Sequence, residues 1–139
     1  MKQARHHLTL EPRGRGLFEV TDEIAAWLAG QSVDEGLLTL FIPHTSASIL
    51  IQEKADPDVR RDIETFFADL VPEGAGLYRH TAEGPDDMPA HIKSALTQTQ
   101  LAIPVSGGRM SLGTWQGIYV FEHRAKAGRR QLILHLIGE

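Results

Sequence analysis

The sequence predicts an α+β fold that is built mainly from antiparallel strands and contains about three helices. Short apolar or alternating segments often follow one another directly, with turns between them. Three other segments combine helical spacing with helix-start signals, and strands and helices do not alternate as a doubly wound parallel sheet requires. The 139 residues are 42% apolar and 23% charged, which is typical of a globular protein and fits one domain over residues 1–139.

The first segments of the chain are predicted as two strands followed by a helix. Residues 3–10 alternate loosely in polarity, and residues 16–20 form a second short strand after a turn that is rich in glycine and arginine. Thr21 is expected to cap a helix that ends near Ala29, because two acidic residues follow it in the first turn and a glycine comes after the helix.

Two strands and a longer helix are predicted next. Residues 36–42 and 45–53 form the strands, and Asp56 with Pro57 provides an N-cap and a first-turn proline for a helix that ends near residue 71. Its apolar residues recur at spacings of three and four, so one helix face is expected to pack on the core: Val59, Ile63, Phe66, Phe67 and Leu70.

The second half is predicted to contain an irregular stretch (72–86), a helix (87–96) and three strands (100–105, 112–124 and 130–137). Residues 125–128 are expected to form a hairpin loop between the last two strands. Segments 37–42 and 132–137 are apolar on both faces. A chain this short cannot easily enclose both of them, so the pattern predicts a subunit interface.

Composition excludes several classes of protein. The chain has no cysteine, which excludes disulfide scaffolds, iron–sulfur clusters, thiolate zinc sites and cysteine nucleophiles. A net charge of −4 argues against non-specific nucleic-acid binding. No apolar run is long enough to span a membrane, and the first residues have no apolar signal region, so we expect a cytoplasmic protein without membrane or nucleic-acid partners.

Three of the seven histidines occur where sites are commonly built: His44 after a strand, His80 in the long loop and His91 near a helix start. Their separations of 36 and 11 residues match no local zinc motif, so a metal site and ordinary hydrogen-bonded histidines both remain open. A three-histidine site would favour zinc, with magnesium as the second choice. Terminal exposure or structural roles are expected for the others: His6, His7, His123 and His135.

Carboxylates near these histidines are candidates for orienting an imidazole or for moving a proton from bound water. They are Glu53 at a strand end, Asp87 before His91, and Glu122 in the long C-terminal strand. The alternatives are helix capping by Asp87 and a solvated strand face for the two glutamates.

A glycine-rich turn ending at Arg109 is a candidate anion site, because backbone N–H groups and a guanidinium both bind anions. In the strand that follows, alternation places Gln116 and Glu122 on one face, from which they could reach the same pocket or simply face water. Trp115 and Phe121 occupy the other face and are expected to pack in the core or at an interface.

Three blocks of the sequence together resemble the YjbQ family, often labelled secondary thiamine-phosphate synthase, over nearly the whole chain. The blocks are residues 44–48 with Glu53 and Asp56-Pro57, residues 86–93, and residues 108–119 with the Leu-Gly-Thr-Trp-Gln-Gly sequence. The resemblance implies a β-sandwich that assembles as a homotrimer. It also implies a pocket around His44, His80 and His91 that holds a divalent metal ion.

The function implied by the resemblance is synthesis of thiamine phosphate from a pyrimidine diphosphate and a thiazole phosphate. We therefore expect a metal-dependent enzyme for small molecules, with Glu53, Asp87, Arg109, Gln116 and Glu122 around the metal site. The alternative is a non-catalytic binding module that holds a small phosphorylated or carboxylated ligand at residues 107–109. The family often has Asn where this chain has Met88, so no role is carried over to that position.

Overall fold

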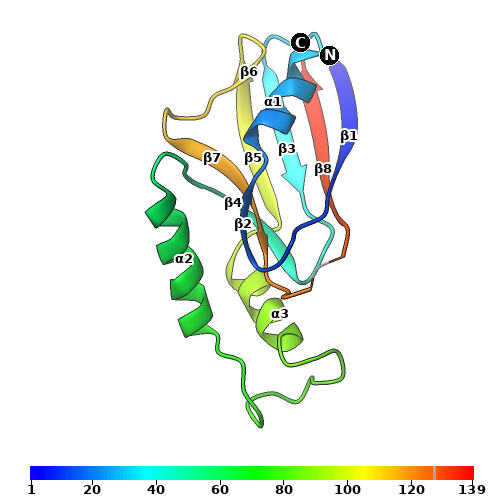
Figure 1. Ribbon diagram of the computed structural model, residues 1–139. Helices are drawn as coiled ribbons and strands as arrows, with labels where there is room; N and C mark the ends of the chain where they lie inside the picture. The colour runs from blue at the N-terminus through cyan, green and yellow to red at the C-terminus, as the bar shows by residue number, and fades with distance from the viewer. Residues whose placement is uncertain (127) are drawn as a thin grey trace.

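Two antiparallel sheets dominate the structure (Figure 1), a computed structural model that describes residues 1–126 and 128–139. The larger sheet has the order β1 (Lys2–Leu10), β8 (Arg130–Gly138), β3 (Gly36–Phe41), β5 (Gln100–Ser106), β6 (Arg109–Met110). The smaller has the order β2 (Gly16–Glu19), β7 (Gln116–Glu122), β4 (Ala47–Glu53). The helices are α1 (Thr21–Ala29), α2 (Pro57–Leu70) and α3 (Asp87–Leu96). The prediction of an antiparallel α+β fold with three helices is confirmed.

The main hydrophobic core lies between the two sheets and is completed by α1. Alternate residues of β3, β5 and β8 point inward, where they meet the smaller sheet and the apolar face of the helix. Representative members with no exposed surface are Ile24, Leu38, Leu40, Ile49, Ile118 and Leu134.

The opposite face of the larger sheet carries several apolar side chains that the described part of the chain leaves uncovered. Leu37 and Phe41 on β3 remain about 41% and 42% exposed, and Ile133 and Ile137 on β8 are partly buried. These are the residues whose two-sided apolar pattern predicts a subunit interface.

The helix α2 begins as predicted but packs less than predicted. Asp56 caps it, with its side chain accepting a hydrogen bond from the Asp58 N–H at 2.9 Å. Ile63 and Phe67 pack against the outer side of the smaller sheet, whereas Phe66 is 60% exposed. A helix over a three-stranded sheet has too little surface beneath it to bury its whole apolar face.

Two further predictions about elements are wrong. Thr21 is the first residue of α1 and does not cap it; its hydroxyl donates to Glu19 and accepts from the Ile118 N–H, both at 2.8 Å. The last two strands do not form a hairpin, because β7 already lies between β2 and β4 while β8 lies between β1 and β3. Ala127, in that predicted loop, is outside the described residues.

The predicted strand 112–124 begins only at Gln116. The Gln116 side chain turns back and accepts a hydrogen bond from the Gly113 N–H at 2.7 Å, which holds residues before the strand in a turn.

Among the described residues, no helix has the length and apolar character that crossing a membrane requires.

Candidate functional site

A buried carboxylate and two imidazoles meet at the start of α3. Asp87 and His91 are four residues apart on the helix, which places them on one face, and the preceding loop brings His80 alongside. The Asp87 Oδ2 atom lies 2.6 Å from His80 Nε2 and 3.0 Å from His91 Nε2. The carboxylate is buried while both imidazoles reach solvent, so the cluster is open on one side.

Both nitrogens of His91 face hydrogen-bond acceptors. Nδ1 lies 2.9 Å from the carbonyl oxygen of Thr45, and Nε2 lies 3.0 Å from the Asp87 carboxylate. A neutral imidazole carries only one N–H, so it cannot serve both acceptors. If the Thr45 carbonyl takes the Nδ1 proton, the Nε2 lone pair faces a carboxylate, and this is favourable only with a cation between them. That cation is either a second proton or a metal ion.

Arg124, just past the end of β7, fixes the position of the carboxylates. Its NH1 group donates to Asp87 Oδ1 at 2.6 Å and its Nε group to Asp86 Oδ2 at 3.1 Å. The remaining NH2 group donates to the Glu83 carbonyl at 2.9 Å, which ties the loop to the helix start. The sequence prediction missed Arg124, because no local motif connects it with aspartates nearly forty residues earlier.

The pKa of Asp87 is lower than that of a free aspartate. Burial alone would raise the pKa, but the hydrogen bond with His80, the Arg124 guanidinium and the nearby His91 outweigh it. The carboxylate is therefore ionised at neutral pH and can act as a ligand without first losing a proton.

His44 lies in a different depression, of about 410 Å³, beside Ser46 and Arg130. Its Nε2 atom accepts a hydrogen bond from the Gln131 N–H at 3.0 Å. Burial and the Arg130 guanidinium lower the pKa of His44, so the ring is neutral at physiological pH. Over residues 1–126 and 128–139, one group of three side chains brings potential metal-ligating atoms within 4.8 Å of one another. It consists of His80, Asp87 and His91, and it does not include His44.

Glu122 is neither solvated nor directed toward the histidine cluster. It is fully buried, and its two carboxylate oxygens each accept a hydrogen bond from the Arg130 guanidinium at 2.6 Å. Arg130 also donates to the Ser46 hydroxyl at 2.9 Å. The sequence left two interpretations of Glu122 open, a pocket face shared with Gln116 or a solvent-exposed strand face. Both are wrong, because Glu122 forms a buried ion pair with Arg130.

The other predicted site residues lie far from the cluster. In the register of β4 with β7, Ala47 pairs with Glu122 while Glu53 pairs with Gln116. These pairs are six residues apart, or about 20 Å along the strands. Arg109 is on β6, at the end of the molecule opposite α3 (Figure 1). Within one chain, the structure thus brings together only His80, Asp87 and His91 of the predicted set.

Comparison with known proteins gives consistent matches over nearly the full chain. A family model described as UPF0047 protein YjbQ-like matches residues 6–139. The chain is 49% identical to a UPF0047 protein from Synechocystis, covering 99% of this chain and 94% of the relative. It is 50% identical to UPF0047 protein YjbQ from Escherichia coli O157:H7, covering 95% and 96%.

Solved structures match the fold. A YbjQ-like protein of unknown function from Sulfolobus solfataricus superposes with a TM-score of 0.89 at 21% identity, covering 99% of both chains. A conserved hypothetical protein from Thermus thermophilus gives 0.84 at 32% identity, covering 95% of this chain and 99% of that one.

These names correct the functional expectation. The relatives at about 50% identity are named only as UPF0047 proteins, and a structural neighbour is described as being of unknown function. None of these names provides evidence of thiamine-phosphate synthesis. The expectation that this chain makes thiamine phosphate is therefore wrong.

Proposed function

We propose that this chain, which belongs to the UPF0047 YjbQ-like family, binds one divalent metal ion through His80, Asp87 and His91 and uses its open side to activate water. The observation that carries the proposal is the placement of His91 between the Thr45 carbonyl and the Asp87 carboxylate. Metal-binding histidines commonly donate their other N–H to a backbone carbonyl or carboxylate, which fixes the ring and exposes a lone pair to the ion.

The donor set favours zinc over magnesium. Imidazole nitrogens suit zinc, whereas magnesium prefers oxygen ligands and keeps much of its water. Ligand atoms around a tetrahedral zinc lie about 3.3 Å apart. The distances of 2.6 and 3.0 Å from Asp87 Oδ2 to the two Nε2 atoms therefore need only a slight opening. Three protein ligands leave at least one position for water, as in catalytic zinc sites.

The test is a zinc titration of metal-free protein by calorimetry, with metal analysis of the purified protein and magnesium as the comparison ion. His80→Ala and His91→Ala should each weaken zinc binding by at least about 100-fold, beyond the loss typical for a supporting residue. His7→Ala, at an exposed position on β1, is the matched control and should bind normally.

His44→Ala distinguishes the ligand set proposed from the geometry from the set implied by the resemblance. The cluster around Asp87 predicts unchanged zinc affinity in His44→Ala, because the Nε2 atom of His44 is occupied by the Gln131 N–H. A loss as large as that of His91→Ala would instead show that His44 is a ligand. Unchanged stoichiometric binding in His91→Ala would overturn the proposal.

We also propose that the uncovered face of the larger sheet forms the contact of a homotrimer. The exposed Leu37 and Phe41 on β3 lie beside the partly buried Ile137 and Ile133 on β8, and clustered exposed apolar residues of this kind often mark interfaces. Light scattering should give a mass near 46 kDa, about three times the 15.4 kDa chain. Phe41→Glu should reduce that mass, whereas Phe66→Glu on α2 should not; a stable wild-type monomer at micromolar concentration would contradict the proposal.

A further inference from the structure

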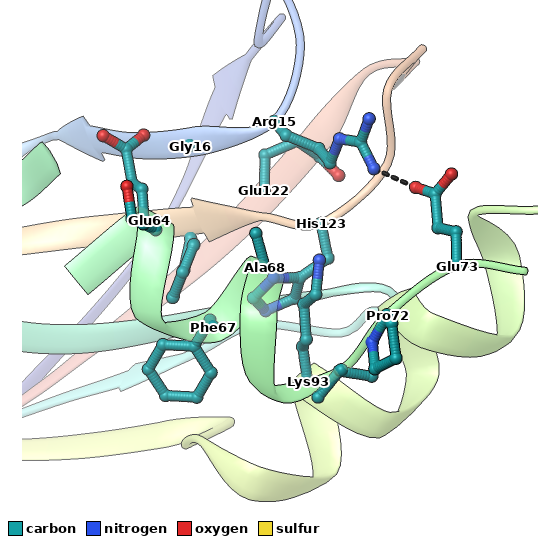
Figure 2. Close-up of a pocket in the computed structure, with 13 residues that line it drawn as sticks. Arg15, Gly16, Glu64, Phe67, Ala68, Pro72, Glu73, Lys93, Glu122 and His123 are labelled. Atoms are coloured by element: carbon teal, nitrogen blue, oxygen red, sulfur yellow. Dashed lines mark hydrogen bonds and ion pairs between the residues drawn. The ribbon is translucent and has the colours of Figure 1, made fainter. Parts of the chain in front are cut away.

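A cavity of about 540 Å³ lies between α2, β7 and the side of α3 that faces away from His91 (Figure 2). Its volume is in the range of small-molecule sites. Aromatic side chains of Phe67 from α2 and Phe121 from β7 form part of its wall, with Val71 at the end of the helix. These residues provide an apolar surface for the body of a ligand.

Lys93 is a largely buried residue whose ammonium group faces this cavity. The residue is 5% exposed, and it lies two positions after His91, which directs it to the other side of α3. In Figure 2 its side chain extends into the cavity beside His123. Within the described part of the chain, no hydrogen bond or ion pair satisfies the ammonium, although its backbone carbonyl accepts one from Thr97. A cation with little access to water and no partner at hydrogen-bond distance favours an anionic ligand.

The carboxylates that line the cavity are already engaged elsewhere. Glu73 pairs with Arg15 at one side of the cavity (Figure 2), and Glu122 is held by both ends of the Arg130 guanidinium. The third, Glu64, accepts a hydrogen bond from a backbone N–H of β2 at 3.2 Å. None of them neutralises the lysine at hydrogen-bond distance.

His123 adds a second buried polar group without a partner. The residue is 1% exposed, its Nε2 atom lies 2.9 Å from the Ser48 hydroxyl, and its Nδ1 atom has no hydrogen-bond partner among the described residues. The Ser48 hydroxyl can donate to Nε2 or accept from it. In the tautomer in which Ser48 donates, Nδ1 carries the proton and is a free donor.

We infer that this cavity binds a small organic acid, whose anionic head pairs with Lys93 and accepts a hydrogen bond from His123 Nδ1 while its apolar body packs against Phe67 and Phe121. The head supplies the charge that the buried lysine lacks, and the body suits the aromatic wall. The site uses the face of α3 opposite the histidine cluster, so it does not depend on the proposed metal function.

The test is calorimetric titration of the full chain with 3-phenylpropionate and phenyl phosphate. Uncharged 3-phenylpropanol tests the role of the head, and inorganic phosphate tests the role of the apolar body. We expect both aromatic anions to bind at least about tenfold more tightly than either control compound. Lys93→Met should weaken binding by a similar factor, whereas Lys126→Met, at an exposed position outside the cavity, should not.

Two additional measurements keep the test decisive if Lys93→Met folds poorly. Ala68→Leu adds bulk to a cavity-lining position on an exposed part of α2 and should reduce binding without removing charge. The ring resonances of His123 should shift on addition of either anion. Equal binding of the alcohol, equal binding of inorganic phosphate, or no binding of either aromatic anion at millimolar concentration would overturn the inference.

Discussion

Acidification is expected to destabilise the protein through His123. Burial, and then the positive charges of Lys93 and Arg130, lower the pKa of this imidazole to about 3. In the unfolded chain the pKa is about 6.5. Below pH 6.5 the unfolded state therefore takes up a proton that the folded state does not bind, so the stability present above pH 6.5 is lost as the pH falls toward 3.

The expected loss follows from the two pKa values. One pH unit corresponds to about 1.4 kcal/mol, so lowering the pH from 7.5 to 5.0 should reduce the free energy of unfolding by about 2 kcal/mol through this residue. His44, whose pKa is also lowered, acts in the same direction. Asp87 contributes little in this interval, because its lowered pKa affects stability only below about pH 4.

Urea unfolding of wild type and His123→Gln isolates this contribution. Glutamine does not titrate and retains an amide that can bond to Ser48. At fixed protein concentration and with a chelator present, the stability advantage of wild type should shrink by about 2 kcal/mol between pH 7.5 and 5.0. His7→Gln, at an exposed position, should keep the wild-type pH dependence.

Parallel pH profiles of wild type and His123→Gln would refute the reasoning. They would mean that the buried imidazole is protonated in the folded state or that water reaches it. A wild type that gains stability relative to the variant in acid would mean that a carboxylate compensates the imidazolium.

Three further outcomes are expected from urea unfolding at neutral pH. Glu122→Gln should reduce the free energy of unfolding by about 3–5 kcal/mol, because it leaves the Arg130 guanidinium buried without its partner. Glu11→Gln, in the exposed pair with Arg129, should reduce it by less than about 0.5 kcal/mol. Asp56→Ala should cost about 1 kcal/mol through loss of the N-cap of α2, and a cost near zero would show that the cap contributes nothing. Trp115→Ala should change the stability of the isolated chain by under about 0.5 kcal/mol, since the side chain is 62% exposed; a loss above 2 kcal/mol would indicate that it is buried in the assembly.

The helices were predictable because their signals are local. An aspartate followed by proline marks the start of α2, and α3 starts at Asp87 with Pro89 in its first turn, although its N-cap residue Asp86 makes no capping hydrogen bond. The assignment of strands to sheets was not predictable in this way. Whether β7 pairs with β8 depends on which strands already occupy their edges, and no turn sequence encodes that.

The candidate site was predictable in part for the same reason. His80, Asp87 and His91 stand out by their places in a loop and at a helix start. Their partner Arg124 does not, because the contact depends on where β7 ends relative to α3. Alternation alone placed Glu122 wrongly, because β7 is covered by the core on one face and by α2 on the other. After Gln116, neither face of the strand is exposed to solvent.

The energetics of α3 connect the two proposed sites. Two of its buried side chains, Asp87 and Lys93, are charged, while its terminal Leu96 is exposed. Pro89 and Ala90 are also buried, so the position of this helix depends both on their packing and on whether the charges are paired. Arg124 pairs with Asp87 at one end, whereas His91 faces a hydrogen-bond acceptor at each ring nitrogen, and the ammonium of Lys93 has no hydrogen-bond or ion-pair partner among the described residues. In the two proposals, a cation on one face and an anion on the other would satisfy both groups, which would explain why a ten-residue helix buries two charged side chains.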